Sequence, residues 1–128
     1  MRLLLDTATF LWLTLDDPKL SNRARALFQN PANEVWLSAV SAWEIAIKHS
    51  LGRLPLPSAP ERFVPEQREA HGIMPLALSE AAVLRLASLP HHHRDPFDRI
   101  LVCQAQADDL VILTSDEAIR AYPVKTDW

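Results

Sequence analysis

The chain has 128 residues, of which 48% are hydrophobic and 23% charged, a composition typical of one globular domain, so we predict a single domain over residues 1–128. Its net charge of −3, from 13 Lys and Arg against 16 Asp and Glu, excludes a uniformly basic nucleic-acid-binding surface. A single cysteine, Cys103, excludes a disulfide framework, and its apolar neighbours predict a small buried side chain rather than a reactive thiol.

The first predicted element is a short strand over residues 2–5 with almost no polar alternation, which is typical of a strand covered on both faces in a parallel sheet. Asp6 ends it, and in α/β proteins ligands bind beyond the carboxyl ends of such strands. Taken alone, Asp6 is equally well explained as a turn residue or helix N-cap. Because Asp6 interrupts the apolar N-terminal stretch and no long apolar run follows, we expect no signal peptide, no membrane span and a cytoplasmic location.

Helical and strand patterns then alternate along the chain. Helices are predicted over residues 7–15, 22–29, 38–49, 61–70, 79–89 and 95–107, with a brief one beginning at residues 115–116. Strands are predicted over residues 35–37 and 111–114, with edge strands over 73–76 and 123–125, where proline is better tolerated than in a central strand. This alternation predicts a three-layer α/β/α fold with a central, mainly parallel sheet.

Apolar positions within these elements predict which side chains are buried. In the helix over residues 38–49, the expected apolar stripe consists of Val40, Trp43, Ile47 and Leu51. The tryptophans expected in the core or at a dimer interface are Trp12, Trp36 and Trp43.

Acidic residues recur near the carboxyl-terminal edge of the predicted sheet. They are Asp6 after the first strand, Glu44 in the helix after the second, Asp95 and Asp98 at a helix start, and Asp116 after the strand over 111–114. Each has a structural alternative. A capping box from Ser41 or an ion pair with Lys48 would explain Glu44. Helix caps and first-turn positions would explain the aspartates.

Taken together, the acids indicate a site for a hard cation. Mg²⁺ and Mn²⁺ prefer oxygen ligands and usually retain several waters, so three or four carboxylates without Cys or His at ligand spacing suit one or two such ions. Sites of this kind are typical of phosphodiester cleavage, in which one ion activates water and another stabilises the leaving oxygen.

Four blocks of the sequence resemble PIN-domain ribonucleases, specifically VapC-like toxins of bacterial toxin–antitoxin pairs. The blocks are LLDT at residues 4–7, SAWEIAIK at 41–48, HHRDPFDRIL at 92–101 and LTSD at 113–116. The resemblance covers essentially the whole chain. It implies a PIN-like fold and a divalent-metal-dependent endoribonuclease whose catalytic and metal-binding residues are Asp6, Glu44, Asp98 and Asp116.

The resemblance also implies roles around these acids. Thr7 matches a hydroxyl residue that orients the first acid or a water, and Thr114 and Ser115 match polar positions near the last acid. Asp95 is interpreted as a cap and supporting residue that could exchange roles with Asp98. For Arg99, two alternatives stay open, namely a contact with substrate phosphate and an internally paired arginine.

The same resemblance implies an RNA substrate, a cognate VapB-like antitoxin and a homodimer. Arg94 is a further candidate for phosphate contact, and Lys48 and Arg53 are weaker ones. Residues 91–93 are three histidines, but consecutive side chains on a loop do not readily converge on one ion. The alternative function is a catalytically inactive PIN-like module that binds protein or RNA. A haloacid-dehalogenase-type phosphatase is disfavoured because Ala8 stands where that chemistry needs a second acid.

Overall fold

The computed structural model describes residues 1–128 and contains a five-stranded sheet with the strand order β3-β2-β1-β4-β5. All four strand pairs are parallel, and β1 lies in the centre between β2 and β4. The strands are β1 (Arg2–Leu5), β2 (Glu34–Ser38), β3 (Met74–Leu76), β4 (Val111–Leu113) and β5 (Thr126–Asp127). The predicted parallel sheet is therefore confirmed.

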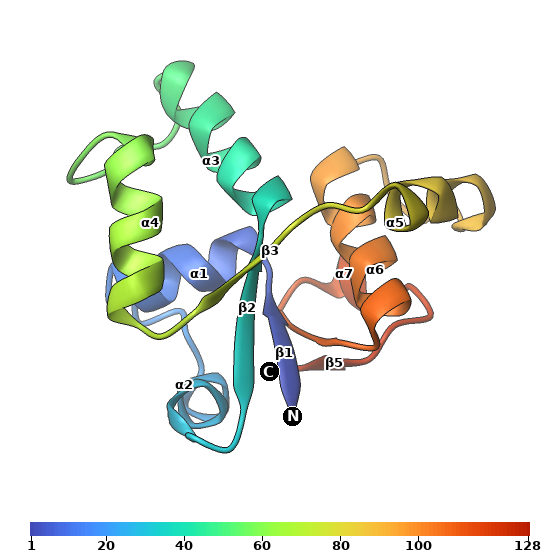
Figure 1. The fold of residues 1–128 in the computed structure, drawn as a ribbon, viewed down its shortest axis with the longest axis horizontal. Helices are drawn as coiled ribbons and strands as arrows, with labels where there is room; N and C mark the ends of the chain where they lie inside the picture. Colours follow the sequence, from blue (N-terminus) through green and yellow to red (C-terminus); the bar gives the residue numbers. More distant parts are fainter.

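Seven α-helices cover the sheet, with α1 to α4 and α5 to α7 gathered in two groups on either side of it (Figure 1). Their bounds are α1 (Thr7–Thr14), α2 (Asn22–Gln29), α3 (Ala39–Ser50), α4 (Pro60–Ala70), α5 (Glu80–Leu84), α6 (Pro96–Asp108) and α7 (Glu117–Arg120). A 3₁₀ turn, Arg85–Ser88, extends α5, so the helix predicted over 79–89 is α-helical only in its first half.

The central strand β1 is apolar because both of its faces are covered. Leu3 and Leu5 enter a core with Phe10 of α1 and Ile45 of α3, whereas Leu4 enters a second core with residues of α6 and β4. All three leucines are fully buried, and each contributes roughly 1.5–3 kcal/mol through removal of its side chain from water. The two cores hold the carboxyl end of β1 in place between the helix layers.

The predicted apolar stripe of α3 is wrong in part. Trp43 is 56% exposed and Leu51 is also exposed, whereas the polar residues Ser41 and Glu44 are buried beside Ile45. Trp43 instead packs edge to face on Phe97, with ring centroids 5.0 Å apart. The buried face of α3 is rotated from the apolar stripe because Ser41 and Glu44 have a polar partner, Thr7, on α1.

The last strand also differs from the prediction. β5 comprises Thr126 and Asp127 rather than residues 123–125. Ile112 of β4 donates its backbone N–H to the carbonyl of Lys125, so pairing starts only after the bend that contains Pro123, which lacks an N–H. The buried position of Cys103 is confirmed.

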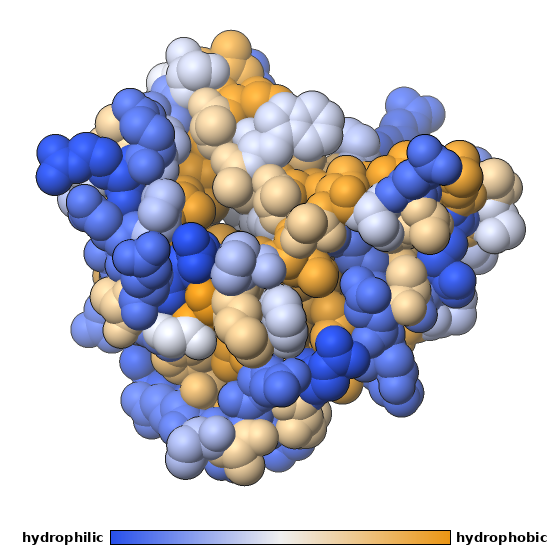
Figure 2. Space-filling model, viewed as in Figure 1, coloured by the Kyte–Doolittle hydropathy of each residue, from blue (hydrophilic) through white to orange (hydrophobic).

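Apolar atoms gather over the middle of the face seen in Figure 2, where β3 passes between α4 and α5 in Figure 1. An open cavity of about 320 Å³ lies beside this edge strand. Most of its lining is hydrophobic and comes from β2, α3, α4 and β3, including Leu37, Ala42, Val64 and Leu76. An apolar surface of this kind is typical of a protein contact.

Candidate active site

The candidate site lies where the topology of the sheet changes direction. From β1 the chain builds outward through β2 to β3, and β4 then adds on the other side of β1. In open α/β sheets, helices leave such a point on opposite faces and a crevice opens beyond the strand ends. Asp6 directly follows β1, and Thr114, Ser115 and Asp116 directly follow β4. The first and last of the candidate site acids, Asp6 and Asp116, are thereby brought to the same edge.

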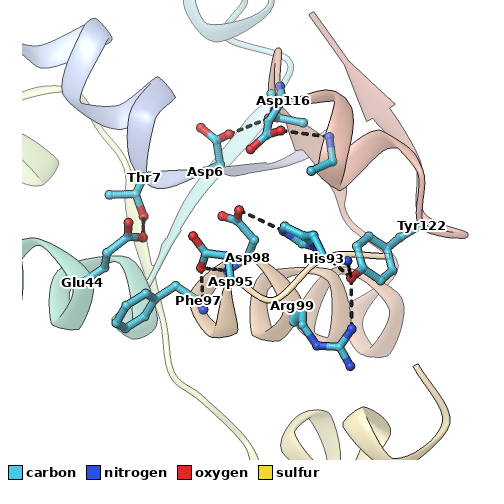
Figure 3. Close-up of polar contacts among 12 residues, drawn as sticks. Asp6, Thr7, Glu44, His93, Asp95, Phe97, Asp98, Arg99, Asp116 and Tyr122 are labelled. Carbon is cyan, nitrogen blue, oxygen red and sulfur yellow. Dashed lines mark hydrogen bonds and ion pairs between the residues drawn. The ribbon is translucent and has the colours of Figure 1, made fainter. Parts of the chain in front are cut away.

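A cavity of about 360 Å³ opens at this edge. It is lined by Asp6, Thr7, Ala8, Trp12, Glu44, Lys48, Asp95, Asp98, Ser115 and Asp116. Five of these ten side chains are acidic and one, Lys48, is basic. Figure 3 shows the carboxylates of Asp6, Asp98 and Asp116 around one space, with Glu44 to one side. The folded chain thus concentrates negative charge in one hollow.

Asp6 is anchored from two sides. Its Oδ1 accepts the backbone N–H of Thr9 at 2.7 Å, so it caps α1, and its Oδ2 accepts the hydroxyl of Thr114 at 2.5 Å. Asp6 is only 5% exposed, and burial raises the pKa of its carboxyl although these hydrogen bonds act in the opposite direction; Asp116 adds a smaller upward contribution. The Asp6 side chain therefore both caps α1 and lines the cavity.

Glu44 is held by residues of two helices. Its Oε1 accepts the hydroxyl of Thr7 at 2.7 Å, and its other oxygen forms an ion pair with Lys48 one turn along α3. This contact with Glu44 raises the pKa of Lys48. The capping box from Ser41 is absent because Ser38 caps α3 and Ser41 lies inside the helix.

Asp95 and Asp98 have different roles at the start of α6. Asp95 Oδ1 accepts the backbone N–H groups of Phe97 and Asp98 at 2.9 and 3.1 Å, which makes Asp95 the N-cap. The side chain of Asp98 takes no part in the cap. Burial and the charge of Asp95, with smaller contributions from Asp116 and Glu44, raise the pKa of the Asp98 carboxyl to about 7.

Asp116 closes the opposite wall. Its Oδ1 accepts the backbone N–H of Ala118 at 2.9 Å, so it caps the short helix α7. Thr114 accepts the backbone N–H of Asp116 at 3.0 Å while donating to Asp6, which ties these two acids to one hydroxyl group. Ser115 lines the cavity, whereas Thr114 is fully buried behind it.

Sequence reasoning missed a hydrogen-bonded chain that ends on Asp98 (Figure 3). Arg99 Nη1 donates to the hydroxyl of Tyr122 at 3.0 Å, that hydroxyl lies 2.8 Å from His93 Nδ1, and His93 Nε2 lies 3.2 Å from Asp98 Oδ2. Since Tyr122 accepts from Arg99, its proton is directed to Nδ1, and Nε2–H then donates to Asp98. No spacing rule pairs His93 with Tyr122, because they are 29 residues apart.

Of the predicted site residues, Asp6, Thr7, Glu44, Asp95, Asp98, Ser115 and Asp116 line the one cavity. Thr114 supports it from behind. Arg99 does not face it: the side chain is buried and donates to the Pro90 carbonyl at 2.7 Å and to Tyr122, beyond His93. Both alternatives for Arg99 remain open, because this internal pairing involves only one of its nitrogens.

The carboxylate oxygens of the cavity are ligands that a hard cation prefers, but they do not form a complete coordination shell. No three Asp, Glu, His or Cys side chains stand close enough together to hold a metal ion as they are arranged. Mg²⁺ is usually bound through one or two carboxylates with waters completing its shell, so a water-sized cavity with facing carboxylates suits it. Burial raises the pKa of the Asp6 and Asp98 carboxyls, and the charge of neighbouring carboxylates adds to the shift.

Comparison with known proteins agrees with this architecture. The sequence profile of the PIN domain matches residues 3–125, nearly the whole chain. The chain belongs to the PIN domain family. A relative, Ribonuclease VapC16 from Mycobacterium tuberculosis, is 43% identical over 60 residues, a match that covers 47% of this chain and 43% of the relative.

Solved structures share the fold at low sequence identity. VapBC2 from Rickettsia felis, bound to a promoter DNA fragment, matches with a TM-score of 0.72 and 13% identity, over 99% of this chain and 98% of that one. VapBC-1 from nontypeable Haemophilus influenzae matches with a TM-score of 0.64 and 18% identity, over 99% and 97%. FitAcB from Neisseria gonorrhoeae matches with a TM-score of 0.60 and 19% identity, over 97% and 95%. These likenesses establish the PIN fold.

None of the helices in this PIN domain has the length and apolar character needed to cross a bilayer.

Proposed function

We propose that this PIN-domain protein is a divalent-metal-dependent endoribonuclease that hydrolyses RNA phosphodiester bonds and acts as the toxin of a toxin–antitoxin pair. The observation that carries the proposal is the convergence of five carboxylates, from the ends of β1 and β4 and from α3 and α6, in one cavity with a single lysine. Membership of the PIN family and the 43% identity to a ribonuclease over 60 residues support the same chemistry.

Asp6, Asp98 and Asp116, together with Glu44, would hold Mg²⁺ or Mn²⁺ in this cavity. The bound ion supplies an activated water and offsets negative charge at the phosphoryl group during hydrolysis. The protein's own part is to hold these carboxylates in place. Thr114 and Thr7 donate hydrogen bonds to Asp6 and Glu44, so neither carboxylate rotates freely when substrate enters.

The first test is cleavage of a panel of structured RNAs by the purified protein with Mg²⁺, with Mn²⁺ and with a chelator. Cutting that requires a divalent ion supports the nuclease, and calorimetry with Mn²⁺ measures binding separately. Metal binding without cutting would mean that the panel lacks the right RNA. If the protein neither binds metal nor cuts RNA, the catalytically inactive binding module becomes the better explanation.

A VapB-like antitoxin and a second copy of the chain are the proposed protein partners. The VapBC complexes from Rickettsia felis and Haemophilus influenzae share this fold along nearly the entire chain. The apolar cavity beside β3 supplies a surface on which a protein contact could form. Analytical ultracentrifugation of the protein alone and after co-expression with a VapB-like antitoxin tests both assemblies.

Thr7→Val should lower the cleavage rate about 10- to 100-fold, because outer hydrogen-bond partners of metal ligands typically have effects of this size. The change removes the hydroxyl that donates to Glu44 but keeps the shape of the side chain. Thr7→Ser, which retains the hydroxyl, is the matched control and should keep most of the activity. Equal loss of activity in both variants would contradict a positioning role for this hydrogen bond.

A further inference from the structure

A second cavity, of about 450 Å³, lies beside the acidic one and has the opposite charge. Its lining consists of His91, His92, His93, Arg94 and Arg99, without any acidic or hydrophobic side chain. His93 separates the two cavities, because it lines the basic one and contacts Asp98 of the acidic one through Nε2. Figure 3 shows the guanidinium of Arg99 on the far side of His93 from Asp98.

Arg99 is the unusual member of this lining. Arg99 is only 7% exposed, yet no carboxylate lies within ion-pairing distance of its guanidinium. A buried charge without a counter-charge is unfavourable, so such a group is normally paired or faces a ligand. Within the folded chain the Arg99 guanidinium lies over the Tyr122 ring, with Cζ 5.9 Å from the ring centroid, but it has no carboxylate counter-charge.

Arg99 lines the basic cavity and has donors without a partner in the chain. Only Nη1 is used within the protein, for the Pro90 carbonyl and the Tyr122 hydroxyl. Nε and Nη2 of Arg99 have no acceptor in the chain. The one side-chain polar atom that is both fully buried and unpaired is Trp36 Nε1, so Nε and Nη2 are not fully buried. Each of these two donors therefore keeps some accessible surface. Together they form the planar pair that binds phosphate oxygens bidentately.

We propose that the cavity lined by His91 to Arg94 and Arg99 binds a backbone phosphate of the RNA, at a position next to the phosphate that is cleaved in the acidic cavity. This inference rests on the proposed function, since it deepens the description of the same substrate. An RNA strand that passes over His93 would place one phosphate in the acidic cavity, where the metal ion would bind. The neighbouring phosphate would lie against Arg99 and Arg94. The basic cavity offsets the repulsion that the acidic cavity exerts on RNA.

The geometry favours phosphate over an acidic protein segment for two reasons. Arg99 presents two parallel donors, and Arg94 adds an exposed cation that makes no other ion pair. The hydrogen-bonded chain from Arg99 through Tyr122 and His93 to Asp98 connects the cavity directly to the proposed cleavage site. An acidic peptide bound only in the basic cavity would not require a hydrogen-bonded link to the acidic cavity.

The test measures binding of a fluorescein-labelled single-stranded RNA by anisotropy in the presence of a chelator, so that no cleavage occurs. Arg94→Ala and Arg99→Gln should each weaken binding about tenfold at low salt, the size expected for one charge-assisted contact. Each should also reduce the slope of log affinity against log salt by about 0.7, the value for one lost phosphate contact on a single strand. Circular dichroism checks the fold of Arg99→Gln, and Arg94 is exposed.

Arg62→Ala is the matched control because it makes the same change in net charge at an exposed arginine of α4, in the other group of helices. Its affinity and salt slope should be close to those of the wild type. Equal slopes in all four proteins would overturn the proposal. So would loss of binding to an acidic peptide in the two cavity variants with RNA binding unchanged, which would assign the cavity to a protein segment.

The two proposals fail in different ways. If the wild type binds RNA with the expected salt slope but neither binds a divalent ion nor cuts RNA, the nuclease proposal fails and the phosphate site stands. If the wild type cuts RNA while Arg94→Ala leaves both KM and the salt slope unchanged, the phosphate site fails and the nuclease stands.

Discussion

Asp6→Asn, Asp98→Asn and Asp116→Asn should each lower the rate of RNA cleavage by about a thousandfold without unfolding the protein. Asparagine keeps a side-chain oxygen for the caps of α1 and α7, so Thr9 and Ala118 retain an acceptor. The change removes one negative charge from the cavity, and with it one ligand on which the activation of water depends. The measurement is single-turnover cleavage with saturating Mg²⁺, with circular dichroism as the check on folding.

Residues that hold one ion act as a unit, so their effects should not add. The double variant Asp6→Asn with Asp98→Asn should be about as inactive as either single variant. Asp108→Asn is the matched control, since Asp108 is exposed at the end of α6 and outside the cavity. Activity near that of the wild type in any of the three cavity variants would remove that residue from the proposed ligand set.

In the metal-free protein, the free energy of unfolding should fall as the pH rises from about 5 to 8, and Asp98 should cause much of the fall. Its folded-state pKa is about 7, against 3.8 for the unperturbed carboxyl. Between these values the folded chain binds a proton that the unfolded chain does not, so rising pH removes stability. Asp98 is 16% exposed in its side chain, and the loss is at most about 4 kcal/mol by linkage.

Urea denaturation with a chelator at pH 5 and pH 8 tests this expectation. Asp98→Asn should be more stable than the wild type at both pH values, and by a larger margin at pH 8 than at pH 5, because asparagine cannot carry the charge. Mg²⁺ should restore stability to the wild type at pH 8 and do less for Asp98→Asn, since binding to the folded state alone stabilises it. The Asp108→Asn variant should follow the wild type at both pH values. A wild type whose stability does not depend on Asp98 would contradict the crowding of carboxylates inferred for the cavity.

Local patterns in the sequence were sufficient to predict the elements that carry the acids. An apolar run without alternation predicts a strand covered on both faces, and β1 is such a strand. Asp95 followed by Pro96 predicts a helix start, and α6 begins there. These signals depend only on residues that are neighbours in the sequence. They can therefore be recognised before the fold is known.

The polar face of α3 could not be predicted in the same way. Its apolar periodicity places Trp43 inside, whereas the structure buries Glu44 and Ser41, because Thr7 of another helix offers them a hydrogen bond. A buried polar side chain is tolerated only where a partner exists, and that partner is distant in sequence. Which face of α3 is buried was therefore decided by packing against α1.

The order of strands and helices and the acids that end or follow them can be predicted from local sequence patterns, and these place a cation site at one edge of the sheet. How those acids are held, which of them share a cavity, and that Arg99 lines a second cavity beyond His93 and Tyr122 depend on contacts between distant parts of the chain. The physical reason is that strand ends are set by local burial patterns, whereas charge neutralisation, desolvation and hydrogen-bond pairing depend on groups that meet only after the chain has folded.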